Sequence, residues 1–204
     1  YLAAEQLLSH RGGKGILFGG ATGVHSAKVL VLGADTMGTA AASAAMRLGA
    51  RVLLLDSDVA NLRAARRELG PCVNTALSTP QYLADHVPGM DVVIACARRS
   101  RGRTAPVIVT DDMVSSMAEG SVIIDLAMDH GGCVQTSRPT TAEELAYRRH
   151  GVIHLCLRHV TALAARGSSF AISHVLTPYV LRLAEAGERY REREPDLWRG
   201  TYTF

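Results

Sequence analysis

The segment 28–38, KVLVLGADTMG, constrains the fold of this 204-residue chain more than any other part of the sequence. A run of valine and leucine that ends at glycine is typical of a strand buried on both faces of a sheet. Gly33 and Gly38 have the spacing of the first and third glycines in the G-x-G-x-x-G turn, which leads into a helix and binds a pyrophosphate. The segment therefore predicts a strand, a tight turn and a helix in a dinucleotide-binding fold.

The middle position of this turn is Asp35 instead of glycine. A glycine there lets the backbone approach the pyrophosphate closely. We expect the Asp35 side chain to project toward the phosphates. Two unit charges about 4 Å apart repel by about 1 kcal/mol in water and about 4 kcal/mol at an effective dielectric near 20. The turn thus predicts weakened or redirected binding of a dinucleotide, unless Asp35 turns outward or pairs with an arginine of segment 98–103.

An acidic residue at the end of the next predicted strand supports a nucleotide site. The alanine-rich segment 39–48 predicts a helix, Gly49 ends it, and segment 51–55 predicts a strand. Asp56 follows, 23 positions after Gly33, near the offset of about 20 at which an acid binds the ribose hydroxyls of NAD. An acid there would repel a 2′-phosphate, which favours NAD over NADP. The alternative is that Asp56 caps the helix that begins near Val59.

The rest of the chain alternates predicted strands and helices, which is typical of an α/β fold with a doubly wound parallel sheet. Further strands are predicted at 73–77, 91–96, 121–125 and 152–157, and further helices at 2–10, 81–86, 111–117 and 169–188. Pro178 is expected to kink the last helix. We divide the chain into a lead-in helix with a glycine-rich connector (1–27), a dinucleotide-binding Rossmann domain (28–168), and a C-terminal interface helix and tail (169–204).

Both terminal helices are expected to pack on something outside this chain. A doubly wound sheet is already covered by its own crossover helices, so the apolar faces of segments 2–10 and 169–188 have no obvious place on it. We therefore expect a missing domain, a partner subunit or a homo-oligomer at these helices. The chain also opens without an initiator methionine, inside a predicted helix, as a piece of a longer protein would.

Composition excludes several classes of protein. The net charge of +3 is too small to indicate nucleic-acid binding. No apolar run approaches the roughly 20 residues of a membrane span, and no signal peptide is present. The four cysteines form no CxxC pair and the histidines have no metal-ligand spacing, so we expect buried, reduced thiols, no metal site and a cytoplasmic location.

Three more segments follow predicted strands, at the sheet edge where such folds bind ligands. Segment 98–103 carries four arginines and could bind an anion, although a solvated loop is the simpler interpretation. In segment 125–133, Asp125 is expected to anchor the loop by backbone hydrogen bonds. Asp129 is expected to orient a substrate amine or relay protons beside a nicotinamide. His159 follows the last predicted strand and could transfer a proton or line the pocket, although a lone histidine is more often structural.

With these segments in order, the chain resembles the nucleotide-binding portion of the alanine dehydrogenase and proton-translocating transhydrogenase family, and the alanine dehydrogenases most closely. The resemblance rests on GGATGV at 19–24, the turn at 33–38, Asp56, DLAMDHGGC at 125–133, TSRPTT at 136–141 and PYVL at 178–181. It implies the C-terminal NAD-binding domain of an oxidoreductase that deaminates L-alanine to pyruvate and ammonia, with hydride transfer from the α-carbon to the nicotinamide. It also implies that a substrate domain is missing from this chain.

The resemblance assigns roles to particular residues. Asp129 would be the catalytic aspartate, acting with a histidine and a lysine of the missing domain. Asp56 would bind the adenosine ribose. The cofactor contacts would fall on Gly33, Ala34, Thr36, Met37, Gly38, Asp56, Ser78, Leu126, Asp129 and His159.

The chain departs from the family pattern at several places around this pocket. The second glycine is Asp35, the loop after the fourth predicted strand is arginine-rich instead of apolar, a lysine expected after Asp56 is Asn61, and an Asn-Met-Pro segment is replaced from His159 onward. These changes leave two alternatives open. One is a non-catalytic, divergent Rossmann module that acts in binding, assembly or regulation, and the other is a transhydrogenase-type NAD subunit.

Overall fold

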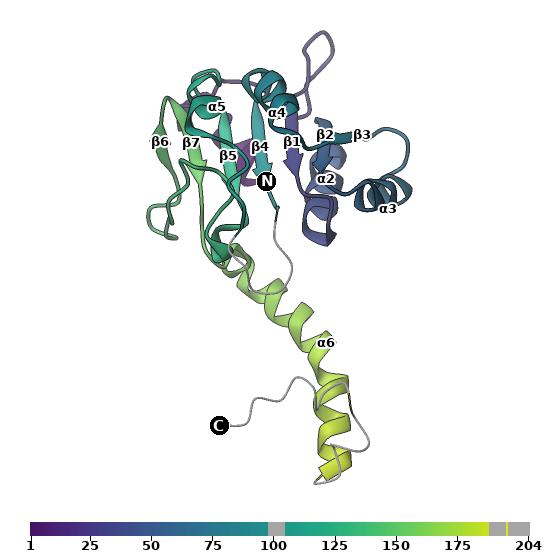
Figure 1. The fold of residues 1–204 in the computed structure, drawn as a ribbon. Coiled ribbons are helices and arrows are strands. Elements are labelled where there is room, and N and C mark those ends of the chain that lie inside the picture. Colours follow the sequence, from purple (N-terminus) through teal and green to yellow (C-terminus); the bar gives the residue numbers. More distant parts are fainter. Residues whose placement is uncertain (98–104, 188–194, 196–204) are drawn as a thin grey trace. The chain divides into compact units, whose positions relative to one another are not determined.

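The computed structural model describes residues 1–97, 105–187 and 195 (Figure 1). The chain splits into two compact units, Tyr1–Arg158 and His159–Phe204. The larger unit is a sheet with helices on both faces, and the described part of the smaller unit is mainly one long helix.

Within the described residues, the larger unit has one seven-stranded sheet. Its strands are β1 (Lys28–Leu32), β2 (Arg51–Asp56), β3 (Asn74–Leu77), β4 (Val92–Ala95), β5 (Val122–Asp125), β6 (Tyr147–Arg149) and β7 (Val152–Leu155). The order across the sheet is β3-β2-β1-β4-β5-β7-β6, and every pairing is parallel except that of β6 with β7. The order reverses between β1 and β4, which is the switch point where doubly wound sheets bind ligands. The predicted doubly wound α/β fold is confirmed.

The helices also follow the prediction closely. They are α1 (Leu2–Gln6), α2 (Thr36–Arg47), α3 (Val59–Leu69), α4 (Pro80–His86), α5 (Asp111–Ser115) and α6 (Ala165–Ala186). Short 3-10 turns lie at Ser9–Arg11, Val87–Gly89, Met128–His130 and Val160–Ala164. Each strand-to-helix connection in the first half of the sheet is short, so the ends of β1 and β2 lead directly into helix N-termini.

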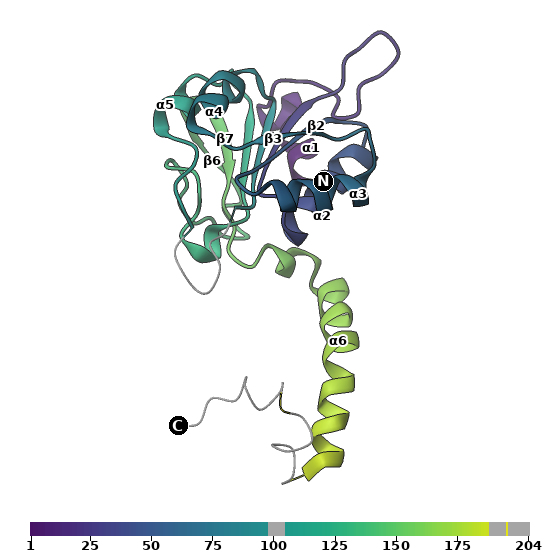
Figure 2. The same ribbon diagram turned by 45° about the vertical axis from the view of Figure 1, so that its right-hand side comes forward.

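Alternating residues of the central strands supply the two layers of the core. Val29 and Val31 belong to a buried cluster with side chains of α1, α2 and α3, whereas Leu30 and Leu32 belong to a second cluster with side chains of α4 and α5. Figure 2 shows α4 and α5 on one side of the sheet and α2 and α3 on the other. Because both faces are covered, the central strands are apolar throughout, as the sequence indicated.

The N-terminal helix packs on the sheet of its own chain. The expectation that it packs on something outside this chain was therefore wrong. Ala3 and Leu7 are 3% and 0% exposed, lie in the same buried cluster as α2, and pack near β5. The connector after α1 is tied down as well, because Lys14 forms an ion pair with Asp91, which also accepts a hydrogen bond from the backbone N–H of Lys28. Segment 1–27 is therefore part of the sheet unit.

The apolar side chains of α6 remain exposed. Those exposed by more than a third are Phe170, Ile172, Val175, Leu176, Tyr179, Val180, Leu181 and Leu183. Pro178 lies inside this helix, as predicted. No helix of the described residues has the length and apolar character needed to cross a membrane.

Strand β6 was not predicted. It is three residues long, carries two exposed arginines, and pairs antiparallel with β7 at the edge of the sheet. The turn between β6 and β7 is His150-Gly151, and both residues have positive φ angles, of 52° and 76°. Two-residue turns with this backbone twist are the ones that join hairpin strands. A histidine-glycine pair between short runs was therefore the available signal.

The cysteines fit the prediction at three of four positions. Cys96, Cys133 and Cys156 are buried, whereas Cys72 is exposed, and none of the four belongs to a disulfide. Cys72 lies in the turn that precedes β3, outside the core. Burial raises the pKa of the Cys133 and Cys156 thiols, so both stay protonated and unreactive.

Candidate functional site

A cavity of about 390 Å³ opens at the carboxyl ends of the central strands, beside the switch point. It is lined by Leu32, Gly33, Asp35, Leu55, Asp56, Ser57, Asp58, Asn61, Ser78, Cys96, Ala97, Pro106 and Ile108. Of the predicted cofactor contacts, Gly33, Asp56 and Ser78 line it directly. Ala34, Thr36, Met37 and Gly38 belong to the turn and first helical residues that adjoin it.

The first and third glycines of the turn are required by packing. Gly33 has a φ of +96°, and a Cβ there would lie 3.1 Å from the backbone of Ala97 at the end of β4. A Cβ on Gly38 would overlap the carbonyl oxygen of Gly33. Neither position has room for a side chain, so the turn lies close against both β4 and the start of α2.

Asp35 is the N-cap of α2. One of its carboxylate oxygens accepts hydrogen bonds from the backbone N–H groups of Met37 at 3.0 Å and Gly38 at 3.1 Å. Its backbone is extended, with φ −76° and ψ −174°, so an L-amino acid fits there without strain. The side chain thus folds over the first turn of the helix while it also lines the cavity.

Asp56 is held at the end of β2 by the turn itself. Its Oδ2 accepts a hydrogen bond from the Ala34 N–H at 2.7 Å, and its Oδ1 accepts one from the Asp58 N–H at 2.8 Å. The N-cap of α3 is Asp58, which accepts from the Ala60 N–H at 2.7 Å. The alternative role of Asp56 as the helix cap is therefore wrong. Its carboxylate oxygens have further lone pairs to offer a ligand in the cavity.

Asp125 anchors the loop after β5, as predicted. It is fully buried, its Oδ1 accepts from the Ala127 N–H at 3.0 Å, and its Oδ2 accepts from the Cys133 and Val134 N–H groups at 2.9 and 3.2 Å. Desolvation raises the pKa of this carboxyl group, although hydrogen bonds from Ser137 and the backbone act in the opposite direction. The loop that carries Asp129 is thereby fixed to the end of its strand.

Two other predicted site residues, Leu126 and Asp129, lie on the loop after β5. Asp129 is exposed in the 3-10 turn Met128–His130, and Leu126 joins its loop to β4 because its N–H donates to the Ala95 carbonyl at 2.8 Å. Neither residue lines the cavity. His159 begins the smaller unit, in a left-handed conformation with φ 52°. The arginines predicted as an anion site fall in segment 98–104, outside the described residues.

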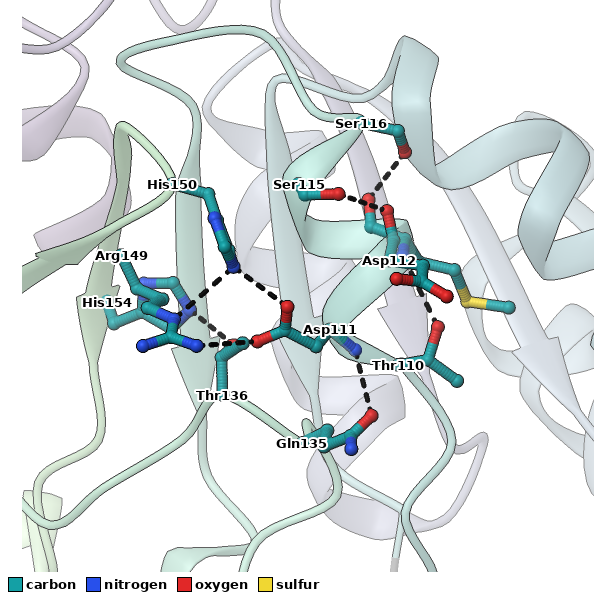
Figure 3. Close-up of polar contacts among 11 residues, drawn as sticks. Thr110, Asp111, Asp112, Ser115, Ser116, Gln135, Thr136, Arg149, His150 and His154 are labelled. Carbon is teal, nitrogen blue, oxygen red and sulfur yellow. Dashed lines mark hydrogen bonds and ion pairs between the residues drawn. The ribbon is translucent and has the colours of Figure 1, made fainter.

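A second polar cluster lies on the β6–β7 side of the sheet (Figure 3). The Asp111 carboxylate, at the first residue of α5, pairs with His150 Nε2 at 2.8 Å and with an Arg149 Nη at 3.2 Å. Desolvation works to raise the pKa of Asp111, but the hydrogen bonds from His150 and Arg149 bring it below its ordinary value. The backbone N–H of Asp111 donates to Gln135. These contacts join α5 to the hairpin, so the cluster is structural.

The chain is similar in sequence to known proteins. Residues 1–203 match the model of the C-terminal domain of alanine dehydrogenase/PNT. The chain is 38% identical over 187 residues to an alanine dehydrogenase of Bacillus subtilis, covering 91% of this chain and 49% of that protein. It is 36% identical over 205 residues to an alanine dehydrogenase of Methanococcus maripaludis, covering 100% and 55%.

Solved structures give the same relationship. An L-alanine dehydrogenase superposes with a TM-score of 0.90 at 34% identity, over 95% of this chain and 54% of that one. A transhydrogenase from Sinorhizobium meliloti superposes with a TM-score of 0.55 at 32% identity, over 65% and 37%. The chain therefore spans about half the length of the curated relatives it matches.

Proposed function

The chain belongs to the alanine dehydrogenase/PNT C-terminal domain family, and on that premise we propose that it binds NAD for an oxidoreductase. The complete protein would deaminate L-alanine, or a related amino acid, to the 2-oxo acid and ammonia. The observation that carries the proposal is the Asp56 carboxylate, held beside the glycine turn in the cavity at the switch point. The free cysteines agree with the cytoplasm, where thiols stay reduced.

Asp56 accounts for the choice of cofactor. The Ala34 and Asp58 N–H groups donate to one oxygen each, and the Asn61 side-chain amide lies 3.5 Å from both oxygens, so the carboxylate is oriented before a ligand arrives. The remaining lone pairs can accept from the 2′- and 3′-hydroxyls of an adenosine ribose. A 2′-phosphate in their place would meet a fixed negative charge. The site therefore takes NAD in preference to NADP.

Replacing this carboxylate should weaken cofactor binding. We expect Asp56→Asn to lower NAD affinity by about tenfold, since a hydrogen bond to a charged group contributes roughly 1.5–3 kcal/mol. The ratio of the NAD affinity to the NADP affinity should fall at the same time. Titrations followed by ligand-observed NMR would measure both affinities.

Asp58→Asn is the matched control for this experiment. Asp58 also lines the cavity, but its carboxylate caps α3, and asparagine caps a helix equally well. We expect its NAD affinity to stay within about twofold of wild type, well under the effect of one hydrogen bond. Equal binding of NAD and NADP by the wild-type chain would contradict the assignment of Asp56.

Asp129 is the proposed catalytic residue. Its exposed position on a loop anchored by Asp125 would let it meet a substrate held by another domain. There it would orient the amine or carry its proton while hydride leaves the α-carbon. The nicotinamide side of the cofactor would then contact Leu126, and Ser78 would contact the adenosine side. A histidine and a lysine of the missing substrate domain would complete the reaction.

The apolar face of α6 is the proposed contact with that domain or with a second copy of the chain. We expect the double substitution Leu176→Asp and Val180→Asp to give a smaller species in light scattering, because both side chains are more than half exposed here and apolar faces of this size are usually covered. The double substitution Val24→Asp and Val107→Asp, at equally exposed positions of the sheet unit, should leave the size unchanged. A wild-type chain that stays monomeric at high concentration would refute the contact with a second copy and leave only the contact with the missing domain.

A further inference from the structure

We propose that the cavity recognises the nucleoside part of its ligand and gains little affinity from the diphosphate, because the chain's own carboxylates occupy three amides of the turn that a diphosphate would use. This inference rests on the proposed function, since it concerns the same cavity. It goes beyond that function by naming which portion of an adenosine-containing cofactor supplies the binding energy.

Three of the backbone donors at the turn already have partners. The Ala34 N–H donates to Asp56 at 2.7 Å, and the Met37 and Gly38 N–H groups both donate to Asp35, at 3.0 and 3.1 Å. Such donors at a glycine turn and helix N-terminus are what binds a pyrophosphate in this class of fold. Each N–H carries a single hydrogen. A phosphate oxygen therefore has to displace a carboxylate oxygen before it can bind here.

Displacement of Asp35 is unfavourable for two reasons. Its extended backbone suits the N-cap position, so the capped state carries no strain that a ligand could release. The helix N-terminus also favours the negative charge of the carboxylate in the same way as that of a phosphate. Ligand and side chain thus compete for one set of donors, and the side chain is always present at the site.

The rest of the cavity remains suited to a nucleoside. Asp56 and Asn61 offer polar groups near the end of β2, and Ser78 offers a hydroxyl near the end of β3. Apolar walls come from Pro106 and Ile108, which can contact the face of a purine. An adenosine can therefore bind without any contact to the amides of the turn.

The test compares ligands with and without phosphates on three chains: wild type, Asp35→Gly and Asp35→Asn. The ligands are adenosine and ADP-ribose, titrated in ligand-observed NMR with a chelator present, because a divalent cation could bridge a carboxylate and a diphosphate. On wild type, the two ligands should bind within about threefold of each other, less than one hydrogen bond to a charged group provides.

The Asp35→Gly variant should bind the two ligands with different affinities. Asp35→Gly frees the Met37 and Gly38 N–H groups, so ADP-ribose should bind at least about tenfold tighter, with adenosine unchanged. Asp35→Asn removes the charge but keeps an oxygen over the same amides, so its gain should be smaller than that of glycine. Both residues are accepted at an N-cap, so both variants are expected to fold, and circular dichroism melts would verify it.

The possible failures are distinguishable. If wild type binds ADP-ribose more than about tenfold tighter than adenosine, or the glycine variant gains nothing, the inference is wrong and the nucleotide site stands. If Asp35→Asn raises the affinity for ADP-ribose as much as Asp35→Gly does, the occupied amides are not the cause of the weak diphosphate binding, and the inference is wrong. If neither ligand binds any of the chains, the proposed function fails and this inference fails with it.

Discussion

Asp125→Ala is expected to lower the free energy of unfolding of the sheet unit by roughly 3–9 kcal/mol, because three buried donors are left without a partner at about 1–3 kcal/mol each. The carboxylate is fully buried and accepts hydrogen bonds from the N–H groups of Ala127, Cys133 and Val134. With alanine, these amides lose their acceptor in a place that water reaches poorly. A loss of this size is a large share of the total stability of about 5–15 kcal/mol of an ordinary domain.

Denaturant unfolding of wild type and variant, followed by circular dichroism, would measure the difference. Asp125→Asn retains one carbonyl oxygen but turns an NH₂ group toward the other amide partners, so its loss should be smaller than that of alanine. Asp85→Ala, at an exposed position of α4, is the matched control and should change stability by no more than about 0.5 kcal/mol. A loss below about 1 kcal/mol for Asp125→Ala would show that the loop finds other acceptors.

The second large effect concerns turnover. This chain by itself is expected to produce no NADH from L-alanine and NAD, whereas a protein that also carries the substrate domain should do so. The groups expected to act with Asp129 belong to that domain, and positioning of reacting groups can contribute about 7–11 kcal/mol to barrier lowering. That corresponds to a rate difference of roughly five to eight orders of magnitude.

The measurement is the absorbance of NADH in the presence of alanine, with a buffer blank. Asp129→Ala in the two-domain protein is the control, because it should abolish the rate even at saturating NAD. Alanine-dependent NADH formation by the isolated chain above the blank would disprove the requirement for a second domain. An inactive two-domain protein that still binds NAD would instead support the non-catalytic alternative.

Local patterns were sufficient to predict most of the fold. The apolar run before Gly33 and the alanine-rich segment after Gly38 specify β1 and α2 through periodicity and turn chemistry, which depend only on neighbouring residues. Strand β6 escaped prediction because Tyr147–Arg149 becomes a strand only by pairing with β7. The burial of Ala3 and Leu7 near β5 could not be predicted from local patterns either, because it depends on contacts with residues far along the chain.

The sequence was sufficient to predict which residues lie near the cavity, but not which hydrogen bonds they form. The positions of Asp56 and Ser78 follow from the ends of β2 and β3, because parallel strands end at one edge of the sheet. What escaped prediction was how the acids are used. Asp35 was interpreted as a charge facing the phosphates, although aspartate before a helix is also the residue expected to cap it, and the structure shows that hydrogen bonding.

The shortness and charge of β6 have a consequence for how this domain behaves among copies of itself. The last strand of an open sheet presents unpaired backbone donors and acceptors, onto which another chain can add a strand of its own. Here that strand is only three residues long and carries Arg148 and Arg149, both exposed. A second copy approaching edge to edge would meet the exposed Arg148 side chain, the ion pair of Arg149 with Asp111, and too few free backbone groups to form a ladder. The hairpin thereby disfavours edge-to-edge association of two copies at this end of the sheet.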